Sequence, residues 1–304
     1  MIAIVGPTAS GKTALSLALA DMLEAEIVAC DSRTIYRYMD IGTAKPSLEE
    51  QAKVPHHLLD VAEPDQSYTV AMYKQEASAA VDSILARGKY AIVCGGTGLY
   101  ARALLEGLSM PAVPPQDELR QELNKLADDK GNQILHARLY DLDKATAERL
   151  NANDRFRIIR ALEVCLTTGR RFSELATRSE EPYKTIWIGL SLHDRLKLKE
   201  MIAARFSQQM DAGLLDEVES LLDRYGETRA LKNAVTYRDL INYIRGRVTK
   251  DEAMAECLKH NYQLARRQLM WFRANEKVNW FVMDQLSTRD VRESVLRMIS
   301  ESGS

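Results

Sequence analysis

The stretch GPTASGKT, residues 6–13, constrains the fold of this chain more than any other feature. It matches G-x-x-x-x-G-K-[ST], a pattern in which backbone N–H groups surround a phosphate, the lysine adds positive charge and the threonine hydroxyl can hold Mg²⁺. The β-branched run Ile2–Val5 precedes it and the apolar run Lys12–Leu23 follows it. These runs supply the strand and the helix that such a loop requires, so we predict a P-loop at this place.

The predicted phosphate-binding residues are those of the loop itself: Gly6, Pro7, Thr8, Ala9, Ser10, Gly11, Lys12 and Thr13. Thr13 is the predicted metal ligand and Mg²⁺ the predicted cofactor. The loop indicates a diphosphate or a triphosphate but does not identify the molecule that carries it. Nucleotide hydrolysis also needs a strand that ends in a carboxylate. The candidate strand, residues 90–94, ends in Cys94 and two glycines, which weakens that interpretation.

Strands and helices alternate along most of the chain, which is typical of an α/β fold. Further strands are expected at residues 26–30 and 185–192, and a helix at Val70–Ala86. The proline-rich residues 110–115 introduce a charged, helical stretch. We therefore predict a P-loop NTPase-like core with a mainly parallel sheet flanked by helices, formed by residues 1–114 and 181–304. An all-helical insertion domain should occupy residues 115–180, and residues 194–280 should be helical.

The composition is that of an ordinary globular protein, with 46% hydrophobic and 28% charged residues and a net charge of -2. This charge argues against coating nucleic acid through bulk electrostatics but allows a local basic surface. The four cysteines lie far apart, and the adjacent His56 and His57 should form structural hydrogen bonds, so no zinc site is expected. Without a signal peptide or an apolar run of ~20 residues, the chain is expected to be cytoplasmic, and we expect a monomer.

Asp31 follows the second strand by one residue and should lie at the same sheet edge as the P-loop. A carboxylate beside bound phosphates is unfavourable unless it binds metal or accepts a proton from a nucleophile. The alternative is a helix N-cap. The loop and Asp31 leave small-molecule kinase and transferase equally open.

Six motifs occur in one order along nearly the whole chain. They are GPTASGKT, DSRTIYRYMDIGTAKP, PHHLLD, GGTGLY, NDRFRIIRALEV and ARRQLMWFR. In this set the chain resembles the tRNA dimethylallyltransferase family, the tRNA isopentenyltransferases. The resemblance implies transfer of a dimethylallyl group from dimethylallyl diphosphate to the exocyclic amine of adenosine 37 of tRNA. It also implies Mg²⁺ and a channel that the base and the isoprenoid enter from opposite ends.

The resemblance assigns roles in this reaction to several residues. Lys12 and Thr13 would stabilise the leaving diphosphate, and Asp31 would accept the proton of the amine. Thr97 would touch the RNA or the reacting atoms, unless it caps the following helix. Arg195 would meet the diphosphate or the base, unless it pairs with Asp194 or Glu200. The predicted catalytic residues are Asp31, Lys12, Thr13, Thr97 and Arg195.

The RNA surface should be local, with arginines that neutralise phosphates beside aromatic rings that can stack. The alternatives are a solvated helix face for any single arginine and core packing for Trp271 or Phe272. The predicted tRNA-binding residues are Asp31, Ser32, Arg33, Thr34, Thr97, Arg120, Phe156, Arg157, Ile158, Ile159, Arg160, Arg238, Arg266, Arg267, Gln268, Trp271 and Arg273.

The chain departs from the family pattern at Thr34, Thr236, Asn261 and Met270, which we expect near the RNA rather than the diphosphate. Asp239 also replaces the usual glutamate. Two alternative functions remain: prenylation of a free adenine nucleotide, and RNA binding without catalysis. The helical insertion favours RNA over a nucleotide, and the intact Lys12, Thr13 and Asp31 argue against an inactive protein.

Overall fold

The computed structural model describes residues 1–302, which form two compact units. Unit 1 contains Met1–Tyr68, Tyr73–Ala101 and the described part of Tyr183–Ser304, and unit 2 contains Thr69–Met72 and Arg102–Pro182. The second segment of unit 2 begins at Arg102, before the proline-rich residues 110–115. No helix in residues 1–302 has the length and apolar character needed to cross a bilayer.

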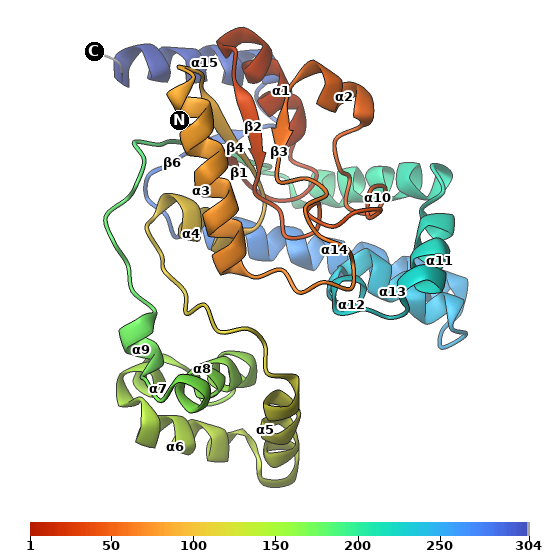
Figure 1. The fold of residues 1–304 in the computed structure, drawn as a ribbon. Coiled ribbons are helices and arrows are strands. Elements are labelled where there is room, and N and C mark those ends of the chain that lie inside the picture. The colour runs from red at the N-terminus through yellow and green to blue at the C-terminus, as the bar shows by residue number, and fades with distance from the viewer. Residues whose placement is uncertain (303–304) are drawn as a thin grey trace. The chain divides into compact units, whose positions relative to one another are not determined.

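Unit 1 is built on a six-stranded sheet with the order β3-β2-β4-β1-β5-β6 (Figure 1). All five pairings between neighbouring strands are parallel, as predicted. The strands are β1 (Ile2–Val5), β2 (Glu26–Ala29), β3 (His56–His57), β4 (Ala91–Gly95), β5 (Ile186–Ser191) and β6 (Val278–Val282). Because β2, β4 and β1 are consecutive neighbours, the segments that follow them meet at one edge of the sheet.

Helices flank this sheet and extend beyond it. Those lying wholly or partly in unit 1 are α1 (Lys12–Leu23), α2 (Leu48–Lys53), α3 (Val70–Ala86), α4 (Gly98–Leu105), α10 (Arg195–Asp211), α11 (Leu214–Tyr225), α12 (Arg229–Asn233), α13 (Val235–Ile244), α14 (Lys250–Arg273) and α15 (Thr288–Ser302). The prediction that residues 194–280 are all helical is wrong at its end. There Val278 begins β6, which pairs with β5 through β-branched and aromatic residues.

The core of the sheet comes from apolar residues of the strands and of two helices. Ile4 and Ile92 of the strands, Leu19 of α1 and Val295 of α15 belong to one buried cluster. Each fully buried aliphatic side chain contributes about 2 kcal/mol of transfer free energy. This packing fixes the start of α1 against β1 and so fixes the P-loop that joins them.

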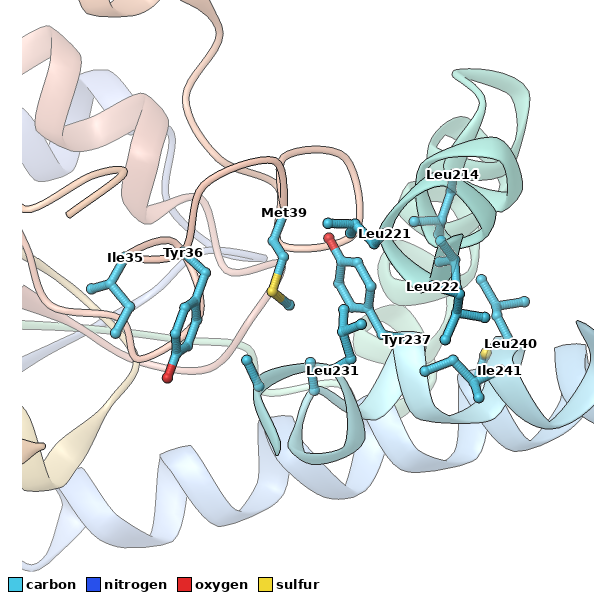
Figure 2. Close-up of a cluster of buried hydrophobic side chains, with 14 of the residues drawn as sticks. Ile35, Tyr36, Met39, Leu214, Leu221, Leu222, Leu231, Tyr237, Leu240 and Ile241 are labelled. Atoms are coloured by element: carbon cyan, nitrogen blue, oxygen red, sulfur yellow. The ribbon is translucent and has the colours of Figure 1, made fainter. Parts of the chain in front are cut away.

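A second buried cluster attaches the loop between β2 and α2 to helices α11–α13 (Figure 2). Ile35, Tyr36 and Met39 come from the loop. The helices contribute Leu214, Leu221, Leu222, Leu231, Tyr237, Leu240 and Ile241. The loop that begins at Asp31 is therefore packed on a helical layer.

Unit 2 is helical apart from its connecting segments, and it has its own core. Its helices are α5 (Asp117–Lys130), α6 (Asn132–Leu142), α7 (Lys144–Arg149), α8 (Arg155–Thr168) and α9 (Phe172–Leu175). Leu123, Leu135, Leu139, Ile158 and Leu162 are buried together. Gly169, with a φ of 68°, ends α8 in the left-handed conformation that favours glycine.

Candidate active site

The P-loop connects β1 to α1 in a shape that depends on its glycines. Gly6 has a φ of 141°, and a Cβ there would lie 2.3 Å from the Leu190 carbonyl oxygen, so a side chain does not fit. Gly11, with a φ of 88°, immediately precedes α1. Ser10 Oγ donates a 2.8 Å hydrogen bond to Pro7 O, which closes the loop. The first N–H groups of α1 and the helix dipole favour an anion here.

Lys12 lies against the inside of the loop and donates from Nζ to Pro7 O at 2.6 Å. Burial lowers the pKa of Lys12 to about 8, and the positive charge of Arg205 adds to this effect. Cys94 and Asp31 oppose it. A bound diphosphate would favour the protonated lysine by supplying the negative charge that burial otherwise makes costly.

The turn that contains Asp31, after β2, is bonded to Thr97, after β4. Asp31 Oδ1 accepts a hydrogen bond from Arg33 N at 2.8 Å, and Thr97 Oγ1 accepts one from Ser32 N at 3.0 Å. A Cβ at Gly95 would lie 2.1 Å from Cys30 O, so the two chain segments touch. No helix begins after Asp31 until Leu48, so the N-cap alternative for Asp31 is wrong. Thr97 uses its side chain to hold the Asp31 turn.

Arg205 of α10 is the residue that the sequence reasoning missed. It is electrostatically coupled to both Asp31 and Lys12, and burial lowers the pKa of its guanidinium while Asp31 raises it. Within residues 1–302 it makes no hydrogen bond or ion pair. The signal was present, because Arg205 lies on the same helix face as the buried Ile202, Phe206 and Gln209.

Arg195, the arginine predicted instead, is the first residue of α10 and is exposed. In the described part of the chain it forms neither of the ion pairs considered for it. The acidic residue before it, Asp194, accepts a hydrogen bond from Leu196 N and caps the helix. The arginine charge that is coupled to Lys12 thus belongs to Arg205, in the middle of α10.

The end of α14 packs against the P-loop and the glycine-rich turn after β4. Gln268 Oε1 accepts a 2.8 Å hydrogen bond from Thr8 N. A Cβ at Gly96 would lie 2.2 Å from Gln268 Nε2, and one at Gly98 would lie 2.0 Å from the Trp271 ring. These glycines therefore allow α14 to approach, and Gln268, predicted to contact RNA, contacts the P-loop through its Oε1.

Three comparisons with known proteins bear on this site. The family described as IPP transferase matches residues 34–275. The tRNA dimethylallyltransferase of Roseiflexus castenholzii is 42% identical, with 99% of both chains covered. That of Thermomicrobium roseum is 40% identical over 99% of this chain and 92% of the relative. The chain belongs to this family.

Solved structures of the family agree with the fold. The tRNA isopentenylpyrophosphate transferase of Bacillus halodurans is 34% identical, with a TM-score of 0.72 over 99% of this chain and 97% of that chain. The corresponding transferase of Staphylococcus epidermidis is 32% identical, with a TM-score of 0.73 over 99% of this chain and 98% of that chain.

Two of the departures from the family pattern contact each other. Asn261 Nδ2 of α14 donates a 2.9 Å hydrogen bond to Thr236 Oγ1 of α13, and both residues are buried. Both side chains therefore fill a helix–helix contact rather than an exposed surface. Thr34 is also buried, and its hydroxyl has no hydrogen-bond partner within residues 1–302. Met270 is exposed, as the expectation requires.

The remaining predicted RNA-binding residues of unit 1 differ in their exposure to solvent and in their side-chain partners. Arg266, Arg267 and Arg273 are exposed on α14, and Trp271 is 37% exposed beside Gly98. Phe272 is buried, as expected for at least one of the two aromatics. Arg238 is half-buried and bonded to Asp239 and His260, a neighbourhood that restrains it.

Four of the predicted RNA residues of unit 2 have structural contacts instead. Arg120 and Arg160 both pair with Glu163, whose side chain is fully buried. Ile158 and Ile159 belong to the core of the unit. Their side chains are thus occupied within the unit, which argues against direct RNA contacts. Phe156, 73% exposed, and Arg157, 62% exposed, remain available at the start of α8.

The residues at the P-loop suit Mg²⁺ bound together with a diphosphate. Mg²⁺ takes few protein ligands and completes its shell with phosphate oxygens and water. Thr13 supplies an exposed hydroxyl at the start of α1. Residues 1–302 contain no group of three or more His, Cys, Asp or Glu residues that could bind a metal alone. The donor set therefore fits a metal that arrives with its phosphate ligand.

Proposed function

We propose that this chain transfers the dimethylallyl group of dimethylallyl diphosphate to the exocyclic amine of adenosine 37 in tRNA and releases diphosphate. The observation that carries the proposal is the meeting of the P-loop with Asp31 and Thr97 at neighbouring strand ends. The P-loop and the Asp31 carboxylate, for which we propose phosphate binding and proton acceptance, therefore lie at the same edge of the sheet. The curated relatives named tRNA dimethylallyltransferases support the same reaction.

The leaving group is held by this chain's own charges. The P-loop N–H groups, Lys12 and Arg205 would bind the diphosphate and stabilise the negative charge that grows as the allylic carbon–oxygen bond breaks. The electron pair of that bond leaves with the diphosphate. Mg²⁺, bound through the Thr13 hydroxyl, would supply further positive charge to these oxygens.

Asp31 would complete the transfer by accepting a proton. Its Oδ1 is occupied by Arg33 N–H, while Oδ2 receives no hydrogen bond from the described residues. As the amine nitrogen forms its bond to the allylic carbon, its proton would move to Oδ2. Asp31 is half-buried at the sheet edge, so the base must leave its stack to reach the carboxylate, and flipping of adenosine 37 belongs to the proposal.

The RNA would be bound by exposed basic and aromatic groups in both units. On unit 1 these are Arg266, Arg267 and Arg273 of α14, and on unit 2 Phe156 and Arg157 of α8. Arginines neutralise phosphates, and an exposed aromatic ring can stack on an unpaired base. We keep the predictions that the enzyme is monomeric and cytoplasmic.

A label-transfer assay tests the proposal. The purified protein is incubated with Mg²⁺ and labelled dimethylallyl diphosphate, together with either AMP or a tRNA that has adenosines at positions 36 to 38. We expect label in the tRNA alone. Label in AMP alone would assign the chain to the prenylation of free nucleotides. Label in neither, with tRNA still bound, would support an RNA-binding protein without catalysis.

A further inference from the structure

A single carboxylate of α11 binds the loop between β2 and α2 through three consecutive backbone groups. Glu217 accepts hydrogen bonds from Asp40 N at 3.1 Å, Ile41 N at 2.7 Å and Gly42 N at 3.1 Å. It also accepts one from the Tyr237 hydroxyl at 2.6 Å. An ionised carboxylate has about four acceptor sites, so all of them are used here.

Other contacts fix the same loop from the same helical layer. Gln209 of α10 donates to Ile41 O at 2.5 Å. A Cβ at Gly42 would lie 2.5 Å from the Tyr237 ring, so the loop touches α13 closely. Ile35, Tyr36 and Met39 of the loop are buried against residues of these helices (Figure 2). The loop is therefore fixed beyond the turn that contains Asp31.

We infer that Glu217 is a positioning residue for the transfer reaction, because it holds in place the loop that presents Asp31 and Arg33. The inference rests on the proposed role of Asp31 as proton acceptor. The P-loop follows a different strand and is not part of this contact. We call the hydrogen bonds from Asp40 N, Ile41 N and Gly42 N to this carboxylate the Glu217 clamp. Loss of the clamp should therefore disturb proton transfer and the approach of the RNA, while binding of the diphosphate is kept.

The replacement Glu217→Gln keeps the size of the side chain and removes half of its acceptors. Its NH₂ group would face N–H donors in place of one carboxylate oxygen, so two of the four bonds are lost together with the charge. Glu219 lies on the same helix and is exposed. Glu219→Gln makes the same change in charge at a position away from the loop and is the matched control.

Single-turnover transfer to tRNA would be measured for both variants at saturating substrates, together with KM for each substrate. We expect Glu217→Gln to lower the transfer rate about tenfold, within the roughly 100-fold that a 1 Å displacement can cost. KM for dimethylallyl diphosphate should change by less than about twofold, since uniform diphosphate binding is untouched. Glu219→Gln should behave as the wild type.

Amide hydrogen exchange supplies a readout that does not depend on activity. The N–H groups of Asp40, Ile41 and Gly42 should exchange faster in Glu217→Gln, while those of the sheet stay protected. Tyr237→Phe, which removes one donor and keeps the ring, should leave both the exchange and the rate near wild type.

The outcomes separate this inference from the proposed function. An inactive wild-type protein would overturn both. An active wild type with an equally active Glu217→Gln would overturn the positioning role alone. The same holds if Glu217→Gln only lowers the melting temperature, or if it weakens diphosphate binding and transfer equally.

Discussion

Burial and neighbours, rather than residue type, decide what each arginine of this chain can do. Arg205 is half-buried, and its charge is coupled to those of Asp31 and Lys12. Arg120 and Arg160 neutralise the buried Glu163, whereas Arg195 is exposed at a helix start. An arginine that forms no salt bridge with a protein carboxylate keeps its N–H donors free for an anionic substrate. We therefore expect Arg205, rather than Arg195, to bind the diphosphate.

Replacing Arg205 tests this assignment. We expect Arg205→Ala to lower kcat/KM for dimethylallyl diphosphate by roughly 100- to 1000-fold, the loss typical when one donor to a developing oxyanion is removed. Steady-state kinetics with saturating tRNA would measure it. Arg195→Ala removes the same charge from the same helix and should change kcat/KM by less than about threefold. Equal losses in the two variants would refute the distinction.

Replacing Asp31 tests the proton acceptor. In Asp31→Asn the amide can still accept from Arg33 N, so the turn should persist, but it cannot take up a proton. We expect the single-turnover rate to fall by about 100- to 10,000-fold, with diphosphate affinity unchanged in a calorimetric titration. A variant that keeps its rate would exclude Asp31 as the base.

At the level of elements, the sequence predicts those strands, loops and helices that depend on a local pattern of residues. The strand–loop–helix of the P-loop and the parallel strands followed from β-branched runs and the glycine pattern, because both depend on neighbouring residues. The pairing of β6, the Glu217 clamp and the Thr236–Asn261 contact join segments that are distant in sequence. Periodicity carries no information on such contacts, so only the folded chain reveals them.

One such element contact makes the stability of unit 1 depend on pH. Glu26 of β2 is buried and bonded to His57 of β3, Arg87 and Lys89. Burial alone would raise the pKa of Glu26, but these bonds outweigh it and lower the pKa from 4.5 to about 2. The ionised carboxylate thus stabilises the fold fully above about pH 4.5. That contribution is lost as the pH falls toward 2.

Urea unfolding of Glu26→Gln at several pH values would measure this effect. At pH 7 the variant should be less stable by on the order of 3 kcal/mol, the free energy equivalent of the pKa shift. The difference from wild type should shrink between pH 4.5 and 2. Glu49→Gln breaks an exposed pair with Lys53 and should cost under about 1 kcal/mol. A pH-independent difference for Glu26→Gln would contradict the argument.

At the level of the whole molecule, each of the two units has its own core and its own exposed basic groups, which we propose as contacts for the RNA. Arg157 of unit 2 and Arg267 of unit 1 are both exposed. Each should therefore release counterions when it neutralises a phosphate, without contributing to the core of its unit. Arg160 differs, because it neutralises the buried Glu163.

Three arginine variants distinguish RNA binding from folding. Arg157→Ala and Arg267→Ala should each weaken tRNA binding, and each should reduce the slope of log affinity against log salt by about 1. The two free-energy changes should add in the double variant if the two arginines bind separate phosphates and share no partner. Arg160→Ala should instead lower the melting temperature of the protein, because it leaves part of the Glu163 charge unpaired.

Binding measured at several salt concentrations, together with thermal unfolding, would distinguish the loss of an RNA contact from the loss of stability. A salt slope unchanged in Arg157→Ala would remove unit 2 from the RNA contact, and an unchanged slope in Arg267→Ala would remove α14.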